Sequence, residues 1–243
     1  MIRFIVVAST LIGFLVSSAG TLWRLKKLEK TDPDAMAQQS LRTVRWILGV
    51  FLRQAGVTVT VKGLENIPQD RPVLYVGNHR SYFDILVGYT TVPGRLGFVA
   101  KKEMERYPFL AQWMHNVDCL FLDRKDVKEG LKTILQGVEK VRHGVSIWIF
   151  PEGTRNRNED LKDLLPFKEG SLKIAEKAGC PVVPVAIRGT AEIFEKHIPR
   201  ICPGHVTIEF GEPFIVKDLP PEERKFAGAY AQKKILEMLE KEG

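Results

Sequence analysis

The sequence of 243 residues predicts an α/β fold: a mixed, largely buried sheet flanked by helices. Three observations lead to this class. From Val57 onward, short runs rich in β-branched residues alternate with longer helical segments, the pattern of α/β proteins. Several short runs are apolar almost throughout, as in Ile147-Trp148-Ile149-Phe150, which is typical of strands covered on both faces. The apolar fraction of 44% is sufficient for a core and excludes a disordered chain.

The elements are expected in an alternating order after Gly56. The strands are expected at Val57–Lys62, Val73–Gly77, Leu96–Ala100, Cys119–Leu122, Ser146–Phe150, Val182–Ile187 and His205–Phe210. The helices are expected at Tyr82–Tyr89, Glu103–Met114, Val127–Arg142, Lys168–Lys177 and Pro221–Lys241. The length fits one such domain with an appendage, so we expect an N-terminal unit at residues 1–55 and an α/β domain at residues 56–243.

The first 55 residues combine the most apolar segment with most of the excess positive charge. Residues 4–23 carry no charged side chain, and as a helix they would extend about 30 Å, the thickness of a bilayer's hydrocarbon core. Residues 1–55 hold eight Lys or Arg against three acids, whereas the remaining 188 residues hold 28 against 26. A basic excess beside an apolar helix favours an anionic membrane surface over nucleic acid as the partner.

A second helix is expected at Met36–Arg53, after a turn and helix-start signal at residues 31–34. Helical periodicity places a polar set of side chains within about 60° of one another, as at a headgroup boundary. These residues are Gln38, Arg42, Arg45 and Arg53. The two helices together predict a membrane-associated hairpin that anchors the protein at the cytoplasmic face of the cell membrane.

Three alternatives remain open for this segment. The first helix could be a removable signal peptide or a true single span. The second helix could pack on the α/β domain with its Arg face in solvent. The first helix also carries small residues at a spacing of four, which permits close approach of a partner helix; these are Ser9, Gly13 and Ser17. Three widely spaced cysteines without a Cys-x-x-Cys motif favour a reducing, cytoplasmic setting over export.

The stretch from Asn78 to Asp84 offers a base and a carboxylate directly after an expected strand. If His79 lies outside the following helix, Asp84 could bond one imidazole nitrogen and leave the other to take a proton from an alcohol. The alternative is that Ser81 and Asp84 only form a helix-capping box. No Gly-x-Ser-x-Gly is present, so direct attack by a substrate hydroxyl is favoured over an acyl-enzyme. The histidines are dispersed, so no metal site is expected.

A second candidate segment is Phe150-Pro151-Glu152-Gly153-Thr154-Arg155. The planar guanidinium of Arg155 can bind two phosphate oxygens at once, and Gly153 would let the backbone approach a ligand closely. The alternative is an ordinary turn at the end of a strand with a solvated arginine. The two segments together indicate chemistry on a hydroxyl of a phosphorylated substrate.

These segments resemble, in order, the sequence blocks of the glycerolipid acyltransferases. The first and third blocks are Asn78-His79-x-x-x-x-Asp84 and Phe150–Arg155, and Val183–Ile187 resembles the fourth. Residues 97–103 and 121–124 resemble the second block. The resemblance covers about residues 57–215 and is strongest to the 1-acyl-sn-glycerol-3-phosphate acyltransferases of bacterial type.

The resemblance implies acyl transfer from a thioester of acyl carrier protein or coenzyme A to the sn-2 hydroxyl of lysophosphatidic acid, giving phosphatidic acid without a cofactor. It implies that His79 is the base and that Asp84 orients it. The substrate's phosphate would be bound by Arg155 and Lys101, in a turn shaped by Glu152, Gly153 and Thr154. Arg124 is a secondary candidate that could instead pair with its acidic neighbours. Alternatives are an acyltransferase for glycerol 3-phosphate or another lysophospholipid, and a non-catalytic lipid-binding protein.

Overall fold

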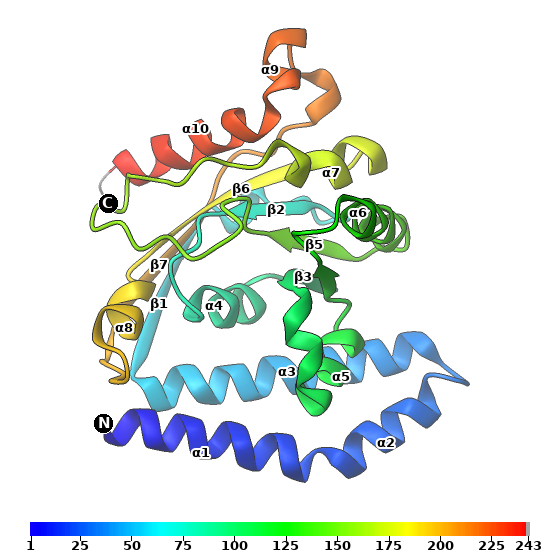
Figure 1. The fold of residues 1–243 in the computed structure, drawn as a ribbon, viewed down its shortest axis with the longest axis vertical. Helices are drawn as coiled ribbons and strands as arrows, with labels where there is room; N and C mark the ends of the chain where they lie inside the picture. Colours follow the sequence, from blue (N-terminus) through cyan, green and yellow to red (C-terminus); the bar gives the residue numbers. More distant parts are fainter. Residues whose placement is uncertain (242–243) are drawn as a thin grey trace.

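A computed structural model describes residues 1–241. All seven predicted strands are present and form one sheet in the order β1-β7-β6-β2-β5-β3-β4 (Figure 1). They are β1 Val57–Lys62, β2 Leu74–Gly77, β3 Leu96–Lys101, β4 Leu120–Leu122, β5 Ser146–Ile149, β6 Val182–Arg188 and β7 Gly204–Phe210. Only the β6–β7 pair is antiparallel, so β2 to β6 run one way while β1 and β7 run the other. The predicted mixed sheet is confirmed.

Helices cover both faces of this sheet, which explains its nearly continuous apolar strands (Figure 1). One face is covered by α3 Pro33–Ala55, α4 Phe83–Thr91 and α5 Pro108–Asn116. The other is covered by α6 Val127–Arg142, α7 Lys173–Ala178 and α10 Ala227–Glu240. Tyr75 and Trp148 pack in the first layer, while Leu74 and Ile147, their chain neighbours, pack in the second. Alternation along each strand therefore supplies two cores.

Three of the five helices expected after Gly56 are interrupted. Residues 103–114 divide into η2 Lys102–Arg106 and α5, because Pro108 holds Tyr107 in an extended conformation. Residues 168–177 begin as η3 Glu169–Leu172 before α7, and residues 221–241 divide at Phe226 into α9 Pro221–Lys225 and α10. Four short elements were not predicted, namely η1 Leu64–Asn66, α8 Thr190–Ile193, η4 Glu195–His197 and η5 Val216–Asp218.

The expected first helix is not continuous, so residues 1–55 form three helices instead of two. Helix α1 Ile2–Ser17 and α2 Ala19–Leu28 meet at Ser18 with a bend of 49°. The Ser18 hydroxyl donates to the Leu15 carbonyl at 2.9 Å and accepts the indole N–H of Trp113 at 3.0 Å, so a side chain from α5 is bonded at the break. No single helix within residues 1–241 is both long enough and apolar enough to cross a bilayer. Helices α1 and α2 reach that length and apolarity only when the bent pair is taken together.

Helix α3 packs on the α/β body, and one residue of its expected basic face was misplaced. Gln38, Arg42 and Arg53 are exposed as predicted. Arg45 instead donates to the carbonyls of Tyr89, Val92 and Gly94 at 3.0, 2.5 and 2.8 Å. Carbonyls at the C-terminal end of a helix such as α4 lack partners within the helix and attract a cation. Arg45 therefore ties α3 to the helix that begins beside His79.

The small residues of α1 do not contact another helix. Ser9, Gly13 and Ser17 are all exposed, and a Cβ added at Gly13 would meet nothing within 4 Å. The side of α1 that packs against the core carries Phe4, Val7, Phe14 and Leu15. Beside it, the Gln54 side chain of α3 donates to the Thr10 hydroxyl at 3.0 Å. The small-residue stripe therefore faces outward.

Candidate active site

The expected site residues come from the same edge of the sheet. In β2 to β6 the carboxyl ends of the strands lie together. His79 follows β2, Lys101 ends β3, Arg124 follows β4 and Arg155 follows β5. Ligands of α/β sheets bind in the crevice beyond the carboxyl ends of the strands. The sheet therefore gathers at one edge residues that the chain separates by up to 76 positions.

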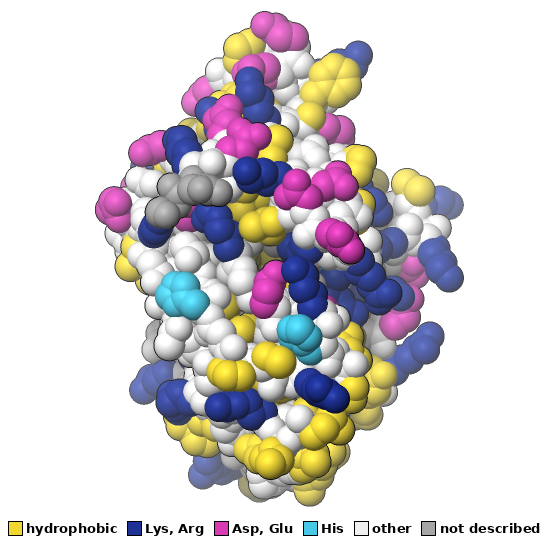
Figure 2. All heavy atoms as spheres, turned by 90° about the vertical axis from the view of Figure 1, so that its left-hand side faces the viewer, with side chains coloured by type: hydrophobic (Ala, Val, Ile, Leu, Met, Phe, Trp, Pro, Cys, Tyr) yellow, Lys and Arg dark blue, Asp and Glu magenta, His cyan; other side chains and the backbone are white. Residues whose placement is uncertain are grey.

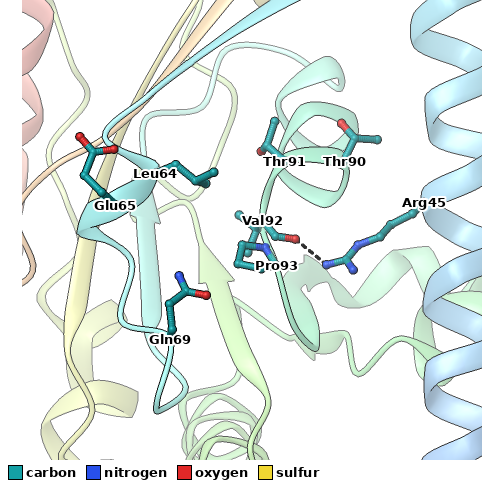
Figure 3. Close-up of a pocket in the computed structure, with 8 residues that line it drawn as sticks. All are labelled: Arg45, Leu64, Glu65, Gln69, Thr90, Thr91, Val92 and Pro93. Carbon is teal, nitrogen blue, oxygen red and sulfur yellow. Dashed lines mark hydrogen bonds between the residues drawn. The ribbon is translucent and has the colours of Figure 1, made fainter.

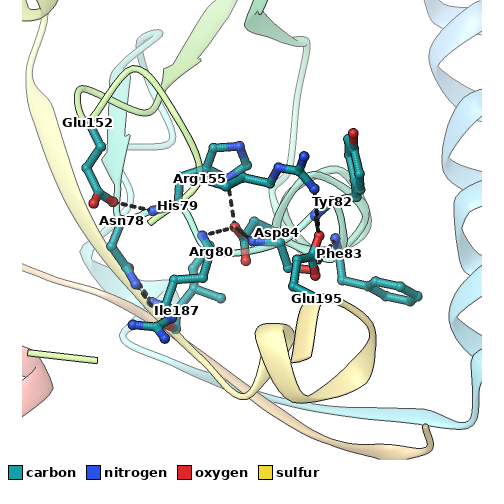
Figure 4. Close-up of polar contacts among 11 residues, drawn as sticks. Asn78, His79, Arg80, Tyr82, Phe83, Asp84, Glu152, Arg155, Ile187 and Glu195 are labelled. Atoms are coloured by element: carbon teal, nitrogen blue, oxygen red, sulfur yellow. Dashed lines mark hydrogen bonds and ion pairs between the residues drawn. The ribbon is translucent and has the colours of Figure 1, made fainter. Parts of the chain in front are cut away.

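The central feature of this edge is a close pair formed by His79 and Asp84 (Figure 4). The Nδ1 atom of His79 lies 2.8 Å from Oδ2 of Asp84, whose side chain is only 1% exposed. The ring stacks on Phe150, with centroids 4.1 Å apart and planes inclined by 12°. No residue in 1–241 bonds Nε2, and 15% of the side chain reaches solvent. The ring is thus fixed by one nitrogen and one face, with its second nitrogen available.

Asp84 also fulfils the capping alternative. The same Oδ2 accepts the backbone N–H groups of Arg80 and Ser81, each at 2.8 Å, and the Ser81 hydroxyl accepts from Phe83 N at 3.0 Å. One carboxylate oxygen therefore closes the first turn of α4 and orients the imidazole. The two interpretations of Asp84 are compatible, because the cap supplies the bend that brings His79 back over the helix.

The backbone of His79 is held by the segment that follows β5. Its N–H donates to Oε1 of Glu152 at 2.7 Å, and its carbonyl accepts from Asn156 N at 2.7 Å. Asn78 fixes the same loop to β6 through a pair of bonds with the backbone of Ile187, at 2.8 and 2.9 Å. The histidine loop is therefore bonded on both sides to neighbouring strand ends.

Glu152 lies beneath this loop and does not face an open anion site. Its second oxygen accepts from Leu165 N at 3.1 Å, and the residue is 4% exposed. Burial raises the pKa of the Glu152 carboxyl, against the opposing effect of the two amide donors. Gly153 has φ +72°, the left-handed region that glycine tolerates, and Thr154 is exposed. The geometry of Glu152 fits the shaping of the turn.

Arg155 reaches from this turn toward the start of α4 (Figure 4). Its guanidinium carbon lies 3.9 Å from the centre of the Tyr82 ring, and NH1 donates to Oε1 of Glu195 at 3.0 Å. The side chain is 25% exposed. Because Asn156 bonds the His79 carbonyl and Tyr82 follows His79 by three residues, Arg155 and His79 belong to one bonded unit.

The other candidate cations at this edge differ in how they are paired. Lys101 is more than half exposed and pairs with Glu103 at 3.0 Å, and Arg124 is exposed. Lys168, which sequence reasoning missed, lies against the turn: its Nζ would be 2.9 Å from a Cβ added at Gly153. No ion pair of Lys168 occurs within residues 1–241. Its distance from the motif in the chain gave no signal of this placement.

A separate hollow of about 590 Å³ lies at the opposite end of α4 from Asp84 (Figure 3). Arg45, Glu65 and Val92 are among its lining residues. The guanidinium of Arg45 is already bonded to carbonyls there. This hollow contains none of the expected site residues and is distinct from the His79 edge.

Fold and site together define an α/β protein with a hydrogen-bonded His79–Asp84 pair beside an arginine suited to an anion. The acyltransferase family model matches residues 58–188. The chain is 30% identical over 192 residues to the 1-acyl-sn-glycerol-3-phosphate acyltransferase of Saccharomyces cerevisiae, covering 79% of this chain and 62% of that protein. It is 34% identical over 155 residues to the enzyme of that name from Borreliella burgdorferi, covering 64% and 61%.

A solved structure agrees with these matches. The 1-acyl-sn-glycerophosphate acyltransferase of Thermotoga maritima superposes with a TM-score of 0.78 at 28% identity, covering 100% of this chain and 95% of that one. The chain spans about three fifths of the length of the first two curated relatives. This protein belongs to the acyltransferase family, as its motifs had indicated.

Proposed function

We propose that the protein is a 1-acylglycerol-3-phosphate O-acyltransferase, which transfers an acyl group from a thioester to the sn-2 hydroxyl of lysophosphatidic acid. The observation that carries this proposal is the His79–Asp84 pair, whose Nε2 has no bonding partner within residues 1–241, joined to the Arg155 segment by the bond from Asn156 N to the His79 carbonyl. The names of the relatives support the choice of acceptor. The thioester, of acyl carrier protein or coenzyme A, is a co-substrate, and no resident cofactor or metal is part of the proposal.

In the proposed reaction, Nε2 of His79 takes the proton as the sn-2 oxygen attacks the thioester carbonyl. Asp84 holds Nδ1 as the bonded nitrogen and stabilises the imidazolium that forms. The tetrahedral intermediate then collapses, the carbon–sulfur bond breaks, and the imidazolium returns its proton to the departing thiolate. The products are phosphatidic acid and a free thiol, so no acyl-enzyme is needed.

The phosphate of the acceptor would bind at Arg155, whose guanidinium provides charge-assisted donors. Lys101, at the end of β3, and Lys168, beside Gly153, are further cations of the same edge. Binding the phosphate there would present the glycerol hydroxyl to His79, and such positioning supplies part of the acceleration. Glu152, Gly153 and Thr154 would shape the turn, and Arg124 remains a secondary candidate.

Helix α1 supports a location at a membrane surface. Seven of its ten exposed residues fall within about 120° at 100° per residue, and most of the seven are apolar; they are Ile2, Ile5, Val6, Ser9, Ile12, Gly13 and Val16. Ile2 and Val16 are 79% and 65% exposed. Figure 2 shows hydrophobic side chains gathered at the end of the molecule where α1 lies, bordered by Lys and Arg side chains. We propose that α1 docks into one leaflet at the cytoplasmic face, with α2 and its lysines at the headgroups.

A side-by-side assay tests the proposed function. The full-length protein receives radiolabelled acyl carrier protein or coenzyme A thioesters together with lysophosphatidic acid, glycerol 3-phosphate or another lysophospholipid. Phosphatidic acid formed fastest from lysophosphatidic acid is the expected result. Faster acylation of another acceptor, or no transfer from either donor, would contradict the proposal.

The location has its own test, the sedimentation of the protein with anionic vesicles. Replacing Ile5 and Ile12 by Glu should release the protein from vesicles, because charged groups enter the apolar phase at high cost. A matched control replaces Leu131 and Leu135, exposed apolar residues of α6, by Glu. Equal vesicle binding by all three proteins would refute the assignment of α1.

A further inference from the structure

We infer that Glu195 is a positioning residue, which holds the guanidinium of Arg155 in the orientation that receives the acceptor's phosphate. None of the sequence motifs includes Glu195. The inference rests on the proposed function, because it concerns how the same site selects a phosphorylated acceptor.

Glu195 joins three strand ends of the site. It is the first residue of η4 and reaches the site from β6 through α8, whereas Arg155 follows β5 and Tyr82 follows β2. Its Oε1 accepts from NH1 of Arg155 at 3.0 Å and from the backbone N–H of Tyr82 at 2.9 Å. Only 13% of its side chain is exposed. One oxygen of this largely covered side chain therefore fixes Arg155 relative to the first turn of α4.

The guanidinium of Arg155 is constrained on two sides and free on the others. Glu195 takes one N–H of NH1, and the ring of Tyr82 lies 3.9 Å from the guanidinium carbon. The N–H groups on Nε and NH2 have no acceptor within the described chain, residues 1–241. A guanidinium carries five N–H donors, and two suffice for a bidentate bond to phosphate. The Arg155–Glu195 pair thus leaves the N–H groups on Nε and NH2 for a bidentate bond to the ligand.

Glu195 could instead be a competitor that occupies Arg155 until phosphate arrives. Its geometry favours positioning. A competing carboxylate would be expected to accept two N–H groups of the guanidinium, one with each oxygen. In Glu195 only Oε1 bonds Arg155, because Oε2 is buried and has no donor among residues 1–241. Oε1 is also anchored by Tyr82 N, which keeps the carboxylate in place whether or not Arg155 has bound a ligand.

The experiment compares Glu195→Ala and Glu195→Gln with wild type, measuring kcat and the KM for each substrate. Removal of the side chain in Glu195→Ala should raise the KM for lysophosphatidic acid about 10-fold, because small misplacements of a binding group are costly. The KM for the thioester should stay within about twofold of wild type. Gln keeps an oxygen acceptor and should stay within about threefold of wild type. Glu192→Ala is the matched control, because within residues 1–241 this exposed carboxylate pairs only with Lys196, at 2.8 Å.

An unchanged or lower acceptor KM in Glu195→Ala would overturn the inference, a lower one in favour of competition. The double variant with Arg155→Ala should bind no worse than Arg155→Ala alone, because Glu195 acts through Arg155; additive losses would also overturn it. Should Glu195→Ala fail to fold, Glu195→Asp replaces it, with the same expected rise in KM, because the shorter chain cannot reach both donors.

The inference and the proposed function can fail separately. If wild type transfers no acyl group to lysophosphatidic acid, the proposed function is wrong. The same Glu195 comparison is then made by binding of lysophosphatidic acid in mixed micelles, in a His79→Ala background. If wild type is active but the Glu195 variants bind the acceptor like wild type, only the inference is wrong.

Discussion

Replacement of Asp84 by Asn tests how the carboxylate controls the imidazole. Oδ2 of Asp84 accepts three N–H donors at 2.8 Å, two of them from the backbone and the third from His79 Nδ1. Because one atom faces all three donors, the amide oxygen of Asn must take that place, and its NH₂ group then occupies the position of Oδ1, which has no donor among residues 1–241. The imidazole keeps an acceptor at Nδ1 but loses the negative charge that stabilises the imidazolium formed when Nε2 takes the substrate's proton.

The expected consequence is a loss in kcat, since binding contacts elsewhere are untouched. General-base catalysis is typically worth about 10²–10⁴ in rate, which corresponds to about 2.7–5.4 kcal/mol of transition-state stabilisation. A His–Asp pair of an unrelated protease, in which the same change was made, loses about 10⁴. We therefore expect kcat of Asp84→Asn to fall by about 10²–10⁴, with a KM for lysophosphatidic acid close to that of wild type.

Steady-state transfer of a radiolabelled acyl group measures both constants, and thermal unfolding measures whether the variant is folded. Ser81→Ala is the matched control for the capping role. Within residues 1–241 the Ser81 hydroxyl accepts only from Phe83 N, so its loss should lower stability by about 1 kcal/mol and change kcat much less than Asp84→Asn does. A folded Asp84→Asn protein with kcat within about threefold of wild type would refute the role of the carboxylate's charge.

Three further predictions follow from the same contacts. Arg155→Ala should raise the KM for lysophosphatidic acid by about 10- to 100-fold, because charge-assisted bonds contribute about 1.5–3 kcal/mol; unchanged KM and kcat would remove Arg155 from the site. Burial raises the pKa of Glu152, so the contribution of this carboxyl to stability is complete below its ordinary pKa and declines as the pH rises through the raised value. In thermal unfolding, the stability advantage of wild type over Glu152→Gln should therefore be smaller at pH 7 than at pH 4. A larger advantage at pH 7 would contradict this. Arg45→Met should lower the free energy of unfolding by about 1–3 kcal/mol, because the carbonyls of Tyr89, Val92 and Gly94 lose their donor. Denaturant titration measures this free energy, and an unchanged value would contradict the prediction.

The sheet was predictable because local patterns determine it. The strands are short runs rich in apolar or β-branched residues, and Ile147 and Trp148 on β5 are both buried, as a two-sided sheet requires. Helix interruptions were harder to predict. The break at Ser18 depends on Trp113, 95 residues away, whose indole bonds the Ser18 hydroxyl. Helical periodicity contains no information about such a contact.

The proposed catalytic residues were easier to identify than those that hold them. His79 and Asp84 are five positions apart, so their pairing could be derived from a loop and a capped turn. The bond of Glu152 to the His79 backbone spans 73 positions, and that of Glu195 to Tyr82 spans 113. These contacts depend on strand order, which brings the ends of β2, β5 and β6 together. Arg45 was misassigned for the same reason, because the end of α4 is adjacent only in the fold.

The most direct test of the central claim is acyl transfer by a His79→Ala variant. Wild-type protein supplied with radiolabelled acyl thioester and lysophosphatidic acid should form phosphatidic acid. The variant should unfold at nearly the same temperature and form it at about 1% of the wild-type rate or less, the loss expected for an absent general base. A folded variant that transfers the acyl group at the wild-type rate would contradict the role of the imidazole.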